Sequence, residues 1–217
     1  GTYFTVFGQV VILVLIQIGG LGFMTMATLF AVFLKRRISL KERLVLQEAL
    51  NQSSIEGIVR LVRKIVKYSL CIEAAGALSF ALRFMLDMKP GRAVYYGIFH
   101  AVAFFNNAGF DLMGDFRSLT DYVGDVWVSI TSMLLIMLGG IGFVVLADLV
   151  DFRSKRKLSL HSKVALSMTG ILIAAGTIVI LAFEYTNGLT IGPLPFGKKL
   201  LAAMFQAVAP RTAGTNT

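Results

Sequence analysis

Four stretches of the chain are apolar for long enough to cross a membrane. The first 34 residues carry no charge, and two further uncharged runs, 126–147 and 164–183, hold 22 and 20 residues. A fourth stretch, 68–85, is apolar except for one acid and one arginine. A hydrocarbon core of ~30 Å takes about 20 helical residues, so each stretch is long enough to span. The pattern predicts four membrane-spanning helices, the first within residues 1–34.

Two other apolar stretches are too short to span. Residues 93–105 and 200–209 hold 13 and 10 residues, and polar or glycine-containing sequence follows each at once. This length is typical of re-entrant or interfacial helices. The predicted order is therefore span, span, short helix, span, span, short helix, an all-α polytopic membrane protein.

Basic residues orient these elements. The segments 35–67 and 151–163 hold fourteen of the 21 lysines and arginines. Cytoplasmic loops carry such an excess, so both segments are predicted to face the cytoplasm and the short helices to enter from outside. The segment 35–67 alternates apolar and basic residues, which suits a helix lying along the cytoplasmic surface or a simple extension of the second span. Both interpretations stay open.

Composition supports a membrane protein and excludes other classes. Charged residues make up 15% of the chain, hydrophobic residues 56%, and the mean hydropathy is +0.76. Disordered proteins have low hydrophobicity, and disulfide-stapled secreted domains need more than the single Cys71. The net charge of +9 does not indicate a nucleic-acid partner, because cytoplasmic loops of membrane proteins account for excess basic charge.

The chain contains an internal repeat. A shift of 120 residues places 16–23 (IQIGGLGF) over 136–143 (IMLGGIGF). A shift of 105 places Asn-Ala-Gly-Phe-Asp at 107–111 over Thr-Ala-Gly-Thr-Asn at 212–216. The repeating unit is a span, a short helix, a glycine-containing loop and a span. The predicted divisions are the closing span of a first unit (1–34), a basic cytoplasmic linker or amphipathic helix (35–67), a second unit (68–150), a basic cytoplasmic loop (151–163) and the opening span and short helix of a third unit (164–217).

The loops after the short helices suit cation binding. Non-helical backbone at membrane depth must be buried in protein or line water. A short helix whose C-terminus points inward places roughly half a negative charge there, which favours cations. Gly109 and Gly214 permit positive φ and close backbone approach, so that carbonyl oxygens can replace an ion's hydration shell. The alternative for either glycine is an ordinary helix cap.

Several other residues allow two interpretations each. The glycine pairs at 19–20 and 139–140 are close-packing surfaces or hinges. Glu73 reaches the cytoplasmic interface or contributes to an ion pathway. His100 is expected to be a packed polar residue, because no second ligand stands at coordinating spacing, and no metal site is predicted. Arg211 pins the adjacent loop, by bonding backbone carbonyls or an acid such as Asp111, or sets the local potential.

Three strings now carry a family resemblance. Residues 1–5 (GTYFT), 104–111 (FFNNAGFD) and 209–214 (APRTAG) resemble the KtrB membrane subunits of bacterial Ktr potassium-uptake systems, within the Trk/Ktr/HKT superfamily. The resemblance implies four membrane-helix, pore-helix, membrane-helix units with re-entrant filter loops, about two of which are present here. It also implies K⁺ as the transported ion, Na⁺ as a stimulating ion, no organic cofactor, a homodimer in the lipid of the cell membrane, and a cytosolic nucleotide-binding regulatory ring like KtrA.

The same resemblance assigns filter residues by position. The second filter would consist of Asn107, Ala108, Gly109 and Phe110, and the third of Thr212, Ala213, Gly214 and Thr215. Arg211 and Asp111 would support the filter. Thr215 stands where the family more usually has Phe. The first and fourth filters fall outside the sequence, so this stretch alone is not expected to enclose a pore.

Potassium uptake is the leading functional prediction. An intramembrane enzyme would need a nucleophile with a base, or metal ligands, inside the bilayer, and no such pairing stands out in the sequence. The chain is therefore not expected to be an enzyme. The alternative is a solute carrier with broken helices and a substrate site near the membrane midplane, since its spans are interrupted by glycines.

Overall fold

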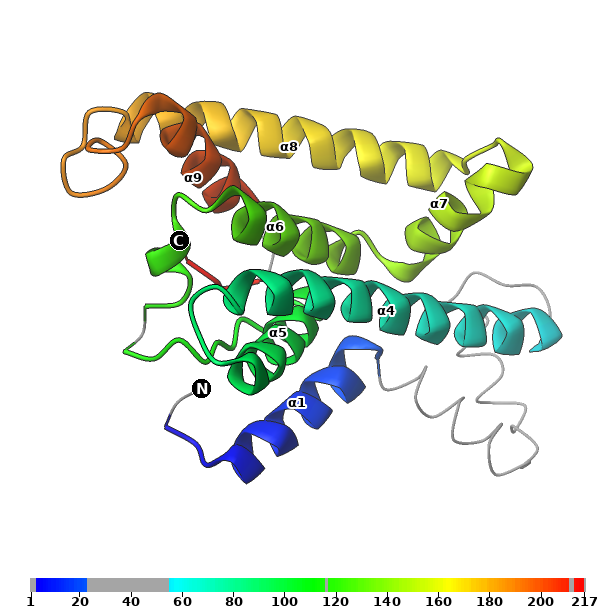
Figure 1. Ribbon diagram of the computed structural model, residues 1–217. Helices are drawn as coiled ribbons and strands as arrows, with labels where there is room; N and C mark the ends of the chain where they lie inside the picture. The colour runs from blue at the N-terminus through cyan, green and yellow to red at the C-terminus, as the bar shows by residue number, and fades with distance from the viewer. Residues whose placement is uncertain (1–2, 23–54, 116, 211–212, 217) are drawn as a thin grey trace.

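The protein is described by a computed structural model that covers residues 3–22, 55–115, 117–210 and 213–216. Within these residues the chain is helical, without strands, as the sequence predicted (Figure 1). The end of the first predicted span and the linker up to residue 54 lie outside the described residues. The helices are α1 (Val6–Gly20), α4 (Ile55–Phe84), α5 (Pro90–Phe105), α6 (Val126–Gly140), α7 (Phe143–Lys155), α8 (Leu160–Glu184) and α9 (Phe196–Val208), with a 3-10 turn η1 (Thr120–Tyr122).

Short polar side chains and prolines set where these helices begin. The Asp125 carboxylate accepts a hydrogen bond from the Val128 N–H at the start of α6, and the Ser159 hydroxyl accepts one from the Ser162 N–H at the start of α8. Each bond satisfies a backbone donor that has no partner within its helix. Pro90 occupies the first position of α5, where its missing N–H costs nothing.

Helix α4 favours one of the two interpretations of the amphipathic segment in its described part. The helix runs without interruption for 30 residues from Ile55 to Phe84, so residues 55–67 extend the second span. At 1.5 Å per residue it is about 45 Å long, more than the ~30 Å hydrocarbon core. Its stretch Val62–Phe84 is long and apolar enough to span.

The span predicted over 126–147 is not one continuous helix. Helices α6 and α7 meet at an angle of 107°, with the break at Ile141 and Gly142. Gly142 has φ +88°, which lies outside the helical region, so the helix cannot continue through it. Glycine adopts this value readily, whereas residues with a side chain rarely do. Gly22, its repeat equivalent, has φ +81° directly after α1. In both copies, therefore, a helix ends two residues before a glycine at positive φ.

The lengths of the helices divide them into two classes. Helices α4 and α8 are each long and apolar enough to cross a membrane, and the bent α6–α7 pair counts as a third crossing if it is taken as one span. Helix α1 has only 15 described residues. By length alone the described residues therefore hold two or three of the four predicted spans.

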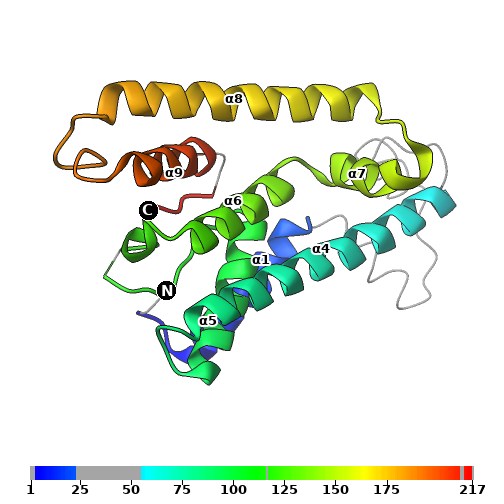
Figure 2. The same ribbon diagram turned by 45° about the horizontal axis from the view of Figure 1, so that its top comes forward.

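Two helical hairpins and a central helix make up the fold. Helix α5 packs against α4, and α9 packs against α8, so each short helix returns along the span that precedes it (Figures 1 and 2). Helix α6 contacts α4, α5 and α9 and thereby joins the hairpins. Figure 2 shows α8 at one edge of the molecule, away from α4 and α5. The second of these hairpins thus repeats the first.

Aromatic side chains form the core between α4 and α5. Phe80 and Phe84 are fully buried and stack with ring centroids 5.6 Å apart, and Phe104 meets Phe80 edge to face at 5.8 Å. The two helices approach closely at Gly97, where a β-carbon would lie 2.7 Å from the Ala77 carbonyl oxygen. This packing fixes α5, and with it the loop that follows.

Candidate functional site

Helix α5 ends in a complete Schellman motif. The Asn107 N–H donates to the Phe104 carbonyl at 3.2 Å, and the Ala108 N–H donates to the Ala103 carbonyl at 2.8 Å. Asn107 adopts the left-handed conformation, φ +51°, that this motif requires. Asn107 therefore ends the helix, and Gly109, two residues further on, is not its cap.

The two predicted loops lie against each other. Gly109 has φ +71° and Gly214 has φ +61°. A β-carbon on Gly109 would lie 2.5 Å from the carbonyl oxygen of Ala213, closer than real β-carbons come to any atom. One on Gly214 would lie 3.9 Å from the Gly109 α-carbon, an ordinary contact. The structure thus brings together two glycines that are 105 positions apart in the sequence.

The remaining predicted site residues fall into three groups. Ala108 is half-buried and Ala213 and Thr215 are buried, whereas the Phe110 side chain is 41% exposed. The Asp111 carboxylate accepts a hydrogen bond from the Met113 N–H at 2.9 Å and so closes a local turn. Arg211 and Thr212 lie outside the described residues.

Unpartnered oxygens gather at these loops. Across the described part of the chain, four buried side-chain atoms lack a hydrogen-bond partner, and three of them are Asn106 Oδ1, Asn107 Oδ1 and Thr215 Oγ1. Buried polar atoms are nearly always paired with protein or ordered water. Three free acceptors at adjoining loops leave capacity to bind water or a cation.

His100 holds the chain where it leaves the first loop. Its ring is fully buried, and Nδ1 lies 2.7 Å from the Tyr96 carbonyl oxygen, which can only accept, so Nδ1 carries the proton. Nε2 then accepts from the Leu112 N–H at 3.3 Å. The described residues hold no cluster of metal-ligating side chains. The burial of the His100 ring and the hydrogen bonds at both of its nitrogens agree with the packed polar residue that the sequence predicted.

One glycine of each pair in the repeat packs tightly against the end of α5. A β-carbon on Gly20 would lie 2.5 Å from the β-carbon of Asn106, and one on Gly139 would lie 2.7 Å from the Phe105 carbonyl carbon and nearer still to its oxygen. Gly20 and Gly139 are therefore close-packing surfaces, the first of the two interpretations that the sequence allowed for these pairs. Two residues after each pair comes a glycine at positive φ, Gly22 after the first pair and Gly142 after the second.

The Glu73 side chain is buried within the protein. Its side chain is 4% exposed, and it accepts hydrogen bonds from Gln17 and Asn106. Sequence reasoning did not single out these two amides. A weak signal existed, because Gln17 interrupts an apolar run and Asn106 precedes the predicted loop.

A cluster of charges joins α4 to the start of α6. Arg83 Nε donates to the Asp125 carboxylate at 2.6 Å, and its Nη1 donates to Asp87 at 2.8 Å. The Tyr122 hydroxyl also donates to Asp87, at 3.1 Å. Burial raises the pKa of Tyr122 to about 12, and the hydrogen bond to Asp87 is the second largest cause of this shift. These residues line a cavity of about 510 Å³ that also reaches Lys198 of α9.

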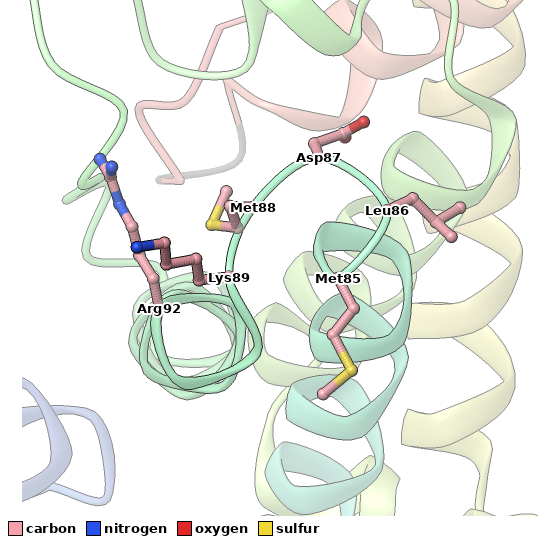
Figure 3. A pocket seen from close by; sticks show the side chains of 6 residues that line it. All are labelled: Met85, Leu86, Asp87, Met88, Lys89 and Arg92. Atoms are coloured by element: carbon pink, nitrogen blue, oxygen red, sulfur yellow. The ribbon is translucent and has the colours of Figure 1, made fainter.

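A second hollow lies at the turn between α4 and α5. It has a volume of about 680 Å³, and Figure 3 shows Lys89 and Arg92 side by side on one flank while Met85 and Leu86 point away from them. Arg92 donates to the Tyr96 hydroxyl at 2.7 Å and lies over its ring. None of the predicted loop residues lines this hollow.

Comparison with known proteins identifies relatives of the whole chain. Residues 2–217 match the family described as TrkH, cation transport protein. The chain is 46% identical over its full length to the Ktr system potassium uptake protein B of Bacillus subtilis and covers 48% of that protein. It is 41% identical to the potassium/sodium uptake protein NtpJ of Enterococcus hirae, over 95% of the chain and 45% of the relative.

A third relative is the Ktr system potassium uptake protein B of Vibrio alginolyticus, 38% identical over the full chain and 48% of the relative. The chain therefore spans about half the length of the curated relatives that it matches. The family description and these names denote transporters and not enzymes, as the sequence predicted.

Proposed function

The chain belongs to the TrkH family of cation transport proteins, and from this premise we propose that it forms part of a potassium-uptake pathway whose selectivity filter includes the two glycine loops. The family and the apolar helices make it a multi-pass protein of the cell membrane. The names of its relatives support K⁺ as the ion that the whole protein transports.

The contact between the two glycine loops carries this proposal. Two short helices of the repeat each lead into a loop with a glycine at positive φ, and the Gly109 backbone leaves no room for a β-carbon beside the Ala213 carbonyl. Packing this close leaves no side chain between the two loops at Gly109. Rings of such oxygens replace the hydration shell of a cation in selectivity filters.

Electrostatics and free acceptors favour a cation at this place. The C-terminal end of α5 points its carbonyl groups at the first loop, and these carry roughly half a negative charge. Asn107 Oδ1 and Thr215 Oγ1 are buried acceptors without partners in the described residues. An ion such as K⁺, which takes oxygen ligands, suits this set. Arg211 and Asp111 are proposed to support the filter.

The assembly is proposed by analogy with the named Ktr systems. A homodimer, a cytosolic nucleotide-binding ring and stimulation by Na⁺ would complete the transporter, with the basic segments 35–67 and 151–163 as the docking surface. The Lys64 ammonium and the Asp151 carboxylate, 2.5 Å apart, tie α4 to α7 within this surface.

Substitution of the filter glycine tests the proposal. In a transporter of full length, Gly109→Ser should lower the preference for K⁺ over Na⁺, because the added side chain displaces the Ala213 carbonyl. Uptake of both ions is measured in cells that lack their own K⁺ transporters. Gly91→Ser, near the start of α5, is the control, since a β-carbon there meets nothing within 4 Å. Unchanged K⁺ affinity and Na⁺ exclusion in Gly109→Ser would refute the filter assignment.

A solute carrier with a midplane substrate site is the second candidate. The 107° break between α6 and α7 favours it, because carriers build their sites from interrupted helices. Ion flux per protein molecule in reconstituted vesicles separates the two. A carrier must change conformation for every substrate, so its flux stays far below that of a continuous pore.

A further inference from the structure

Glu73 is the most conspicuous polar group of the membrane region that the filter proposal leaves without a role. It lies in the spanning part of α4 and is the only buried carboxylate among the described residues. No lysine or arginine of the described ranges forms an ion pair with it. A buried carboxylate without hydrogen bonds is costly, so its partners decide what it does.

Two amides from two other segments bond the same oxygen of Glu73. Gln17 Nε2, on α1, donates to Glu73 Oε1 at 3.0 Å, and Asn106 Nδ2, at the end of α5, donates to it at 2.9 Å. Asn106 Nδ2 also donates to the Val102 carbonyl of its own helix at 2.9 Å. The carboxylate thus connects three segments that are far apart in the sequence.

Asn106 is the residue through which this cluster acts on the loop. It is the last residue before the predicted filter and the C-cap of α5. Gly20 packs against its side chain so closely that a β-carbon would overlap it. The Asn106 side chain is therefore held between the end of α1 and Glu73, and Asn107 follows it directly in the left-handed conformation.

We infer that Glu73 is a positioning residue for the filter: its carboxylate holds the Asn106 side chain and thereby sets where the loop 107–110 begins. This inference rests on the proposed function, since it assigns a role within the same filter. Glu73 has no contact with the loop residues themselves among the bonds described, so its effect passes through Asn106.

Exchange of the acid and the amide tests the pairing. Glu73→Gln keeps a carbonyl oxygen in place and should retain the preference for K⁺ over Na⁺. Asn106→Asp sets two carboxylates side by side and should reduce that preference about tenfold. The double variant Glu73→Gln with Asn106→Asp restores one donor opposite one acceptor, and the preference should return. Glu73→Leu, which has no acceptor, should resemble Asn106→Asp.

Ser69→Ala is the matched control. Ser69 lies one turn before Glu73 on α4, is fully buried and makes no hydrogen bond through its hydroxyl in the described structure. Its substitution disturbs the same helix without touching the cluster and should leave selectivity unchanged. Thermal stability and protein amount are measured for every variant, so that a folding defect is separated from a change in selectivity.

The outcomes distinguish this inference from the proposed function. If Gly109→Ser loses the preference for K⁺ while Asn106→Asp and Glu73→Leu keep it, the filter stands and the positioning role is wrong. If Gly109→Ser keeps the preference, the filter assignment itself is wrong. If Glu73→Leu fails to fold, the positioning role is judged from Glu73→Gln, Asn106→Asp and their double variant. A folded double variant that remains unselective, or a folded Glu73→Gln that loses selectivity, overturns the inference.

Discussion

A methyl group at Gly139 should separate the central helix from the end of α5. The β-carbon would lie 2.7 Å from the Phe105 carbonyl carbon and nearer still to its oxygen, whereas real β-carbons stay at least 3.0 Å from such atoms. Both partners are helical backbone, so neither can rotate aside. The helices must part, and overpacking of this kind costs about 1 to 3 kcal/mol.

The neighbouring glycines provide a graded control. A β-carbon on Gly140 would meet only the Asn107 amide nitrogen, at 3.2 Å, and that side chain can move. One on Gly19, in the other copy of the repeat, would meet nothing within 4 Å. Gly19→Ala should be neutral or stabilising by up to about 1 kcal/mol, because alanine has a higher helix propensity than glycine.

Thermal unfolding and rubidium uptake of one preparation measure both consequences. Gly139→Ala should be less stable than Gly19→Ala and should transport less, because the Phe105 carbonyl lies two residues before the loop. Gly140→Ala should fall between them. Equal stability and equal uptake for Gly139→Ala and Gly19→Ala would mean that α6 and α5 do not touch at this point, and the packing argument would fail.

Three further predictions follow from single features. Gly109→Ala should impair transport more than Gly214→Ala, since both must adopt positive φ but only the first meets the Ala213 carbonyl; uptake rates at equal protein amount compare them. The absorbance difference between wild type and Tyr122→Phe should titrate near pH 12 and not near pH 10. Above about pH 10 the unfolded state loses this proton first, so stability should fall as pH rises towards about 12, and Tyr122→Phe should remove that part of the fall. A cysteine at Lys157 should resist an impermeant reagent added outside intact cells; ready labelling would invert the proposed topology.

Local sequence properties predicted the helices well. A spanning helix must present apolar side chains along its whole length, so the uncharged run 164–183 falls within α8. The short apolar stretches 93–105 and 200–209 likewise lie within or beside α5 and α9. The repeat marked the two glycine loops, whose ion-binding role stays a prediction.

Contacts between distant segments could not be predicted in this way. The bonds of Glu73 join residues 56 and 33 positions apart, and nothing within one helix specifies such a partner. The break at Gly142 was missed because Ile-Gly-Phe is as apolar as a continuous span, and hydropathy does not register φ. The left-handed Asn107 was missed because asparagine adopts that conformation only where the helix end requires it.

The unequal lengths of α6 and α8 predict different responses of the two helices to membrane thickness. Helix α6 is about 22 Å long before its break, shorter than the ~30 Å hydrocarbon core, whereas α8 is about 38 Å long. Helix α6 is held by three neighbouring helices, but only 6% of the apolar window of α8 is buried. A helix longer than the bilayer responds by tilting. Thinner lipid should therefore tilt α8, and α9 would turn with it, while α6 stays in place.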